Sequence, residues 1–265
     1  MLCDFHLHTS FSGDSDTPPE DQILKAAALN MPRICVTDHH DMDVVSDCDF
    51  TLDLPKYFPA MEALREQYRD QIRIEIGIEL GLQNHIAQKL HETAVSYPFD
   101  FIIGSCHFID GQDPYFPAFF QGKSDKEAYR RFFEVTLKRV EKLNCFDSLG
   151  HLDYVVRYGP AKNRYYDPKE YFDIIDPILR ILVHRGKALE CNTGGLHYGL
   201  GHPNPCEEIL RRYRELGGEL ITVGSDAHVP SRLGYDFDYV RDLLKACGFS
   251  HYTVYHQRKP EFLPL

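Results

Sequence analysis

The chain has 265 residues, of which 43% are hydrophobic and 26% are charged, and these fractions are typical of a globular protein. The formal net charge of −11 at pH 7 opposes binding to a nucleic-acid backbone, and no basic stripe offsets it. The sequence contains no apolar stretch of about 18 residues, so it predicts no membrane span. Residues 1–8 lack the features of a signal peptide. We therefore expect a cytoplasmic protein with neither a nucleic-acid nor a membrane partner; the oligomeric state is left open.

The chain contains eight cysteines and no CxxC pair. Cys35, Cys106 and Cys191 lie in apolar runs that are typical of buried strands. The pattern favours reduced, mostly buried thiols over disulfides or a zinc–thiolate site.

Short apolar runs alternate with longer amphipathic segments along the chain. The predicted strands are Leu2–His6, Arg33–Thr37, Ile72–Glu79, Asp100–Cys106, Phe146–Gly150, Lys187–Cys191 and Glu219–Gly224, with a weaker run at Tyr252–Tyr255. The predicted helices run from Pro18 to about Asn30, from the capping box Ser124–Glu127 to near Asn144, from Asp167 to Gly186, from Asn204 to Gly217, and up to Gly248. This alternation predicts a parallel sheet covered by helices, closed into a barrel, in one domain that spans residues 1–265.

Residues able to bind a metal follow six of the seven main predicted strands. They are His6 and His8, Asp38 and His39, Glu79, His107, His151, and Asp226 and His228. The active sites of α/β barrels are assembled at these carboxyl ends of the strands. We therefore expect the polar residues to meet at one face of the barrel.

The spacing within these groups also indicates metal binding. Residues i and i+2 of an extended chain point to the same side, so His6 and His8 can bind one ion. Glu79 is the leading candidate to bridge two ions, because a carboxylate has two oxygens. Imidazoles together with carboxylates favour zinc, manganese or iron, and the number of donors exceeds what one tetrahedral ion needs.

In their order along the chain, these residues resemble the motifs of the PHP (polymerase and histidinol phosphatase) superfamily. The matching segments are His6-Leu7-His8-Thr9, Thr37-Asp38-His39, Glu79, His107, His151 and Ser225-Asp226-Ala227-His228. The resemblance covers nearly the whole chain, and it implies a distorted (β/α)7 TIM-like barrel that carries two or three divalent metal ions. Three further segments, 105–111, 150–153 and 192–201, are similar to the histidinol-phosphate phosphatases of this superfamily.

The resemblance implies three ion positions. One ion would be held by His6, His8, Glu79 and Asp226; a second would share Glu79 and add His107 and His151; a third would be held by Asp14, His39 and His228. Asp16 remains an alternative to Asp14.

The implied activity is the hydrolysis of L-histidinol phosphate in histidine biosynthesis, without a covalent enzyme intermediate. A water between two ions roughly 3.5–4 Å apart would attack phosphorus in line. Arg157, Arg164 and His197 are the candidate phosphate ligands, and His197 stands where related histidinol phosphatases have arginine. Asp153 or His197 could protonate the leaving oxygen. Arg157 could instead be a surface charge, and Asp153 could instead orient His151.

A long loop, Phe108–Lys123, is expected to shape the substrate pocket. Its Asp113 and Tyr115 could contact the ammonium and imidazole of the small phosphorylated substrate. Two other functions remain open: a PHP phosphoesterase that acts on another phosphomonoester or a mononucleotide, and a metal-binding accessory domain without turnover.

Overall fold

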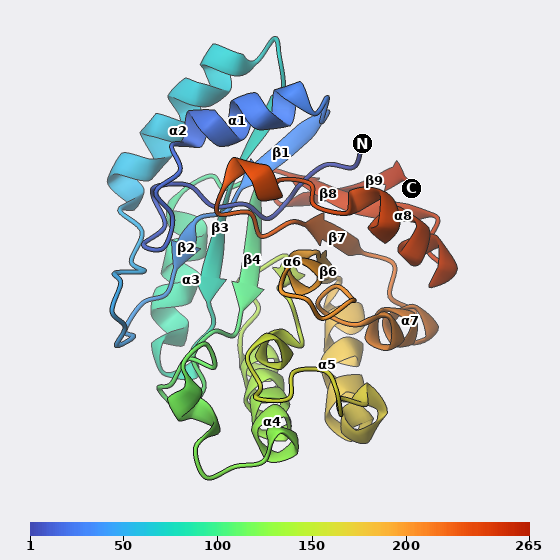
Figure 1. Ribbon diagram of the computed structural model, residues 1–265. Coiled ribbons are helices and arrows are strands. Elements are labelled where there is room, and N and C mark those ends of the chain that lie inside the picture. Colours follow the sequence, from blue (N-terminus) through green and yellow to red (C-terminus); the bar gives the residue numbers. More distant parts are fainter.

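The computed structural model describes all 265 residues, and a curled sheet of parallel strands lies at its centre (Figure 1). The strands are β1 (Arg33–Val36), β2 (His39–His40), β3 (Arg73–Gly81), β4 (Phe101–Ser105), β5 (Ser148–Leu149), β6 (Ala188–Asn192) and β7 (Ile221–Gly224). They lie in the order β1-β3-β4-β5-β6-β7, β2 pairs with β3, and every pair is parallel. The predicted α/β fold with a distorted barrel is confirmed.

The amino-terminal segment joins the two ends of this sheet, but it is not the regular strand predicted at Leu2–His6. Isolated parallel bridges pair Asp4 with Ile34 on β1 and Leu7 with Ala227 beyond β7. The segment passes very close to β7, since a Cβ added at Gly224 would lie 2.2 Å from the Cβ of His6. Glycine at this position therefore permits the close approach of the segment that carries His6.

Helices cover the outside of the sheet (Figure 1). They are α1 (Pro19–Ala28), α2 (Leu54–Tyr68), α3 (Ala87–Ser96), α4 (Asp125–Lys142), α5 (Phe172–Arg185), the short α6 (Gly194–His197), α7 (Glu207–Glu215) and α8 (Phe237–Ala246). The predicted capping box of Ser124 starts α4, and Gly186 ends α5 in a left-handed conformation. Helix α7 begins at Glu207 rather than at Asn204, because the backbone of Asn204 is paired with Asn192.

The weak eighth run does not join the barrel. It forms β8 (His251–His256), which pairs only with β9 (Lys259–Pro264) in an antiparallel hairpin. The hairpin turn lies against the amino-terminal end of β4, where the backbone N–H of Arg258 donates to the carbonyl of Asp100 at 2.9 Å. The hairpin thus occupies the end of the barrel opposite the carboxyl ends of the strands.

One cluster of 73 buried apolar residues connects the sheet, the helices and the hairpin. Its members run from Leu2 to Tyr255, so both ends of the chain contribute to the same core. None of the helices combines the length and the apolar character needed to cross a membrane.

Candidate metal centre and substrate pocket

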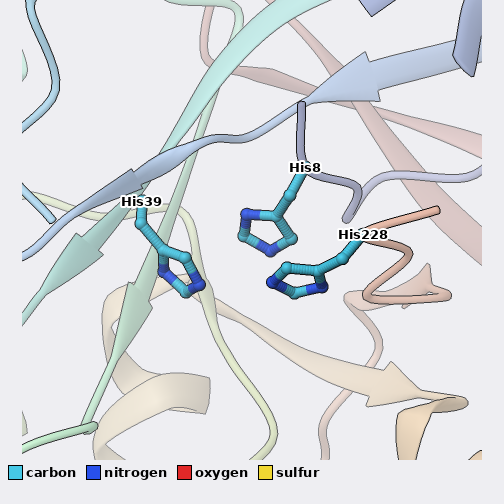
Figure 2. A group of neighbouring side chains, drawn as sticks. All are labelled: His8, His39 and His228. Carbon is cyan, nitrogen blue, oxygen red and sulfur yellow. The ribbon is translucent and has the colours of Figure 1, made fainter. Parts of the chain in front are cut away.

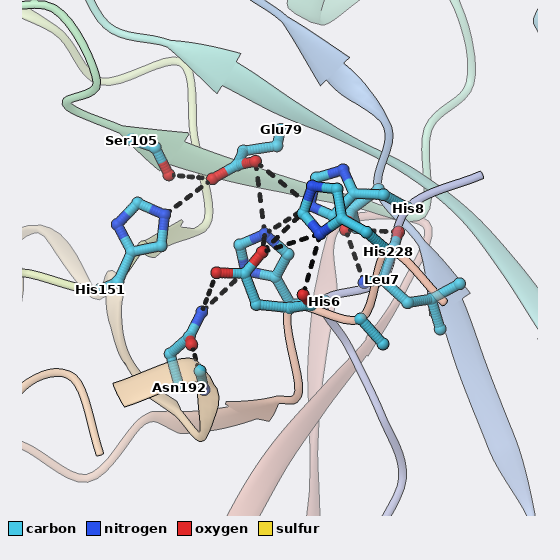
Figure 3. A network of polar contacts seen from close by, with 12 residues as sticks. His6, Leu7, His8, Glu79, Ser105, His151, Asn192 and His228 are labelled. Atoms are coloured by element: carbon cyan, nitrogen blue, oxygen red, sulfur yellow. Dashed lines mark hydrogen bonds and ion pairs between the residues drawn. The ribbon is translucent and has the colours of Figure 1, made fainter. Parts of the chain in front are cut away.

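Side chains from the carboxyl ends of the strands converge on one polar cluster (Figure 3). All nine residues predicted as metal ligands belong to it: His6, His8, Asp14, His39, Glu79, His107, His151, Asp226 and His228. Most of these side chains are buried, and Asp14 and His228 lie at the more exposed edge.

Glu79 lies at the centre of the cluster with no exposed surface, and its two oxygens face different partners (Figure 3). Oε1 lies 3.2 Å from Nε2 of His107 and 3.0 Å from Nε2 of His151. Oε2 lies 3.3 Å from Nε2 of His6 and 3.6 Å from Nε2 of His8. This arrangement is the one required of a carboxylate that bridges two ions.

The first group of donors has the dimensions of a single coordination sphere. Nε2 of His6 lies 3.1 Å from Nε2 of His8 and 3.6 Å from Oδ1 of Asp226. The distance from Nε2 of His8 to Oδ1 of Asp226 is 3.3 Å. Four donors held about 2.1 Å from one tetrahedral ion are about 3.4 Å apart, so these atoms and Oε2 of Glu79 fit one ion without rearrangement.

A second group lies on the other side of Glu79. Nε2 of His107 and Nε2 of His151 are 3.4 Å apart, and both face Oε1 of Glu79. Both histidines also line the pocket above the cluster, so this group faces space that water or substrate can enter, as in sites where a metal keeps an open position.

A third group lies toward the surface, where the rings of His8, His39 and His228 face one another (Figure 2). The ring of His8 stacks at 4.2 Å on both His39 and His228. Oδ2 of Asp14 lies 3.1 Å from Nε2 of His228 and 3.6 Å from Nε2 of His39. Asp14, and not the alternative Asp16, is therefore the carboxylate of this group.

The charge state of the cluster suits bound cations. Oε2 of Glu79 and Nδ1 of His39 are buried without a hydrogen-bond partner of good geometry, although each lies close to other polar atoms. Burial opposes ionisation of Glu79, yet His6, His107 and His39 hold its pKa well below the usual range. A coordinated cation provides the same positive charge that protonated imidazoles otherwise supply.

Several buried residues that were not predicted fix the orientation of these ligands. Nδ1 of His6 lies 2.6 Å from Oε1 of Glu190, and Nδ1 of His107 lies 3.1 Å from both oxygens of Asp41. Such contacts fix the tautomer that leaves Nε2 free for a metal. The sequence could have indicated Glu190, because it is a charged residue inside an apolar predicted strand and lies two positions before Asn192, on the same side of that strand.

Arg157 is buried rather than a surface charge. Its Nε donates to Oδ1 of Asn204 at 2.7 Å, Nη2 donates to Oδ1 of Asn192 at 2.8 Å, and Nη1 donates to Oδ2 of Asp226 at 2.9 Å. Burial opposes the charge of Arg157, but Asp226 outweighs it and raises the pKa of the guanidinium further. Arg157 also lines the pocket described below.

Three other predicted residues lie outside the pocket. Asp153 is fully buried, and its oxygens accept hydrogen bonds from Nδ2 of Asn204 and from the backbone N–H of Cys206, so its carboxylate neither orients His151 nor lines the pocket. The exposed His197 lies beside Tyr198 and Tyr235, with 5.4 and 5.8 Å between ring centroids, Arg164 is also exposed, and neither residue lines the pocket. The geometry does not favour these three residues as phosphate ligands or proton donors.

A pocket of about 610 Å³ opens directly over the ligand cluster. The predicted loop residues Asp113 and Tyr115 line it, so the structure brings them to the site. Its other walls are rich in aromatic rings, which come from Phe50, Phe108, Phe116, Tyr154, Tyr158 and Tyr198. An aromatic pocket with carboxylates suits a small cation that carries a phosphate.

Comparison with known families agrees with this geometry. The model of the PHP domain matches residues 4–194 of the chain. This chain belongs to the PHP domain family. The match includes seven of the nine clustered residues, and Asp226 and His228 lie beyond it.

Relatives that resemble this PHP domain chain along its length have been named as phosphatases. The histidinol-phosphatase of Lactococcus lactis is 34% identical over 257 residues, which cover 97% of this chain and 95% of that protein. A probable histidinol-phosphatase of Thermotoga maritima is 31% identical over 96% of this chain and 95% of its own length.

A solved structure extends the similarity to three dimensions. The crystal structure of a histidinol phosphate phosphatase from Lactococcus lactis, complexed with zinc, L-histidinol and phosphate, matches this PHP chain with a TM-score of 0.89. Its sequence identity is 32%, and the match covers 98% of this chain and 100% of that chain.

Proposed function

We propose that this chain is a metal-dependent phosphatase that hydrolyses L-histidinol phosphate to L-histidinol and phosphate, a step of histidine biosynthesis. The proposal rests chiefly on one observation: three adjoining groups of imidazoles and carboxylates surround Glu79 beneath a pocket of substrate size. The similarity to histidinol-phosphatases along the whole chain supports the choice of substrate.

The proposed metal ligands follow the three groups. The first ion would be held by His6, His8, Glu79 and Asp226, the second by Glu79, His107 and His151, and the third by Asp14, His39 and His228. Zinc, manganese and iron all suit these nitrogen and oxygen donors. When bound, the ions supply an acidified water and neutralise charge on the phosphoryl group.

The protein's own part in the reaction is to hold and orient the phosphoryl group. A guanidinium has five N–H donors, and Arg157 uses three of them on Asn204, Asn192 and Asp226. One N–H on each terminal nitrogen remains for the phosphoryl oxygens, whose negative charge grows toward the transition state. The same contacts keep Arg157 fixed, so little reorganisation is needed during the reaction.

The remainder of the pocket recognises the cationic part of the substrate. Asp113 lines the pocket, and its Oδ1 accepts a hydrogen bond from the backbone N–H of Tyr115 at 2.8 Å. Aromatic faces such as those of Tyr154 and Tyr158 attract ammonium groups and stack on imidazole. Asp113 and Tyr115 are therefore the proposed substrate contacts.

Steady-state kinetics on a panel of phosphomonoesters test this function. We expect kcat/KM for L-histidinol phosphate to exceed that for p-nitrophenyl phosphate and for a mononucleotide by about a hundredfold, or roughly 2.7 kcal/mol. Asp113→Asn should reduce this advantage while leaving the rate on p-nitrophenyl phosphate nearly unchanged. A higher kcat/KM for another member of the panel would favour a different phosphomonoester, equal values would contradict the proposed specificity, and no phosphate release with added manganese would favour an accessory domain.

We further propose that residues 1–265 form one domain that works in the cytoplasm. The single buried apolar cluster supports one domain. All eight cysteines are free and seven of them are buried, which suits a reducing compartment.

A further inference from the structure

A line of buried hydrogen bonds connects the interior of the protein to the first group of ligands. Nδ2 of Asn204 donates to Oδ1 of Asp153 at 2.5 Å, Nε of Arg157 donates to Oδ1 of Asn204 at 2.7 Å, and Nη1 of Arg157 donates to Oδ2 of Asp226 at 2.9 Å. Asp153 and Asn204 have no exposed surface. Neither of them lines the pocket, and Arg157 is the pocket residue that the side chain of Asn204 contacts.

Asp153 determines which way the amide of Asn204 faces. Both oxygens of the Asp153 carboxylate accept hydrogen bonds. Oδ2 accepts from the backbone N–H of Cys206 at 3.0 Å, and Oδ1 faces the amide of Asn204. Oδ1 therefore requires a donor, and only the NH2 end of the Asn204 amide supplies one. The carbonyl end must then face Arg157, where it accepts from Nε.

The surroundings hold Asn204 in this position. Its backbone N–H and carbonyl both pair with the backbone of Asn192 at 2.8 Å. A Cβ added at Gly195 would lie 2.7 Å from Oδ1 of Asn204, so no space remains for the side chain to move in that direction. The position of the Asn204 amide is therefore restricted by its backbone pairing with Asn192 and by the close approach of Gly195 in α6.

The backbone of Asp226 is unusual, and its side chain is held by Arg157. It adopts a left-handed conformation with φ of 58°, which asparagine and aspartate tolerate better than other residues. Arg157 donates to Oδ2 at 2.9 Å and Nδ2 of Asn192 at the longer distance of 3.4 Å, which leaves Oδ1 directed at His6 and His8. The direction of one carboxylate oxygen therefore depends on the position of the guanidinium.

We propose that Asp153 and Asn204 are positioning residues that orient Arg157. In this orientation Asp226 presents Oδ1 to the first ion, and the two free N–H groups of Arg157 face the phosphoryl oxygens. The part of this inference that concerns the phosphate contact rests on the proposed function. The part that concerns the orientation of Asp226 does not.

Two isosteric single variants and their combination test the proposal. In Asn204→Asp two acceptors face each other within the line of hydrogen bonds, whereas in Asp153→Asn the new NH2 group faces a donor, either the NH2 of Asn204 or the backbone N–H of Cys206. In the double variant Asp153→Asn/Asn204→Asp the pairs along the line are matched again, because the NH2 of the new asparagine donates to the new carboxylate, which accepts from Arg157. Only the long contact of Nδ2 of Asn204 with the backbone carbonyl of Asp153, at 3.4 Å, is lost. Net charge is the same as in the wild type.

We expect each single variant to lower kcat and zinc affinity by about 10–100-fold, as is usual for residues that orient metal ligands. The double variant should recover both quantities to within about fivefold of the wild type, because the coupling between adjacent partners is restored. Zinc affinity is measured on the apoprotein by competition with a chelator, and the melting temperature checks folding. Asp173→Asn, which breaks the exposed pair of Asp173 with Arg130, serves as the control and should change neither quantity.

Two outcomes would overturn the proposal. Single variants that keep wild-type kcat and zinc affinity would show that the line of hydrogen bonds has no effect on the site. A double variant as impaired as the folded single variants would show that matched donors and acceptors do not matter. If Asp153→Asn does not fold, Asn204→Asp and the double variant give the same comparison. If the wild type lacks phosphatase activity, the proposed function fails, whereas zinc affinity still tests the positioning role.

Discussion

At the scale of single residues, the site depends on which atom of each side chain faces inward. Oδ1 of Asp226 faces Nε2 of His6 and Nε2 of His8, while Oδ2 is bound by Arg157. The carboxylate therefore has two different tasks, one at each oxygen. An amide of the same shape can perform only one of them, because its NH2 group repels either the cation or the guanidinium.

We therefore predict that Asp226→Asn abolishes turnover. Removal of a residue that only orients a metal ligand lowers activity by about 10–100-fold, and the decrease in kcat for Asp226→Asn should be larger. The fold should remain intact, because asparagine also tolerates the left-handed conformation at this position. The measurement is kcat on L-histidinol phosphate with circular dichroism as the folding check, and Asp238→Asn on the exposed face of α8 is the control. Wild-type turnover in Asp226→Asn would refute the proposed site.

The sequence predicted the clustered residues but not the residues that orient them. His6, Glu79 and Asp226 could be found because each lies at the end of an apolar run. The roles of Asp41 and Asn204 depend on contacts with distant parts of the chain, and no local spacing predicts those contacts. His197 was expected at the phosphate from the resemblance alone, and the structure places its ring beside Tyr235 instead.

At the scale of elements, hydrophobic runs and capping residues predicted most of the barrel. The capping box at Ser124 and the glycine at position 186 fixed the ends of α4 and α5. The hairpin β8–β9 was not predicted, because alternation along Tyr252–Tyr255 does not reveal which sheet a strand joins. The amino-terminal segment lacks regular pairing although its side chains lie as expected.

Asp100 anchors the hairpin to the amino-terminal end of the barrel. Its Oδ2 accepts from the backbone N–H of Ile76 at 3.0 Å and from Arg65, and its Oδ1 accepts from the backbone N–H of Gln257 at 3.0 Å. Nδ1 of His256 lies 3.1 Å from Oδ1. Burial opposes ionisation, but the two backbone donors and Arg65 hold the pKa of Asp100 below its usual value.

We predict that Asp100→Asn lowers the free energy of unfolding by about 1–3 kcal/mol at neutral pH, because one buried donor loses its acceptor. A carboxyl group whose pKa is lowered by folding stabilises the protein above its unfolded-state pKa, and this contribution is lost as the pH falls through the folded-state pKa. The difference in the free energy of unfolding between the wild type and Asp100→Asn should therefore become smaller below about pH 4. Urea unfolding between pH 3 and pH 7 measures it, and a difference that grows on acidification would contradict the anchor.

At the scale of the whole molecule, the two ends of the barrel have different tasks. The hairpin and its polar anchors occupy the amino-terminal end, and the ligand cluster occupies the carboxyl-terminal end, where barrel enzymes carry their active sites. The net charge of −11 does not prevent binding of a phosphate. Bound divalent ions invert the local charge, and buried Arg157 adds a fixed positive charge beside them.

If several cations share one cluster around Glu79, titration of the apoprotein with zinc or manganese will show more than one bound ion per chain. The protein is stripped with a chelator, and metal content and the rate on L-histidinol phosphate are measured after each addition. The account predicts two or three ions per chain and a rate that rises only after more than one equivalent has bound. Full activity with a single equivalent, or activity without stoichiometric metal, would contradict it.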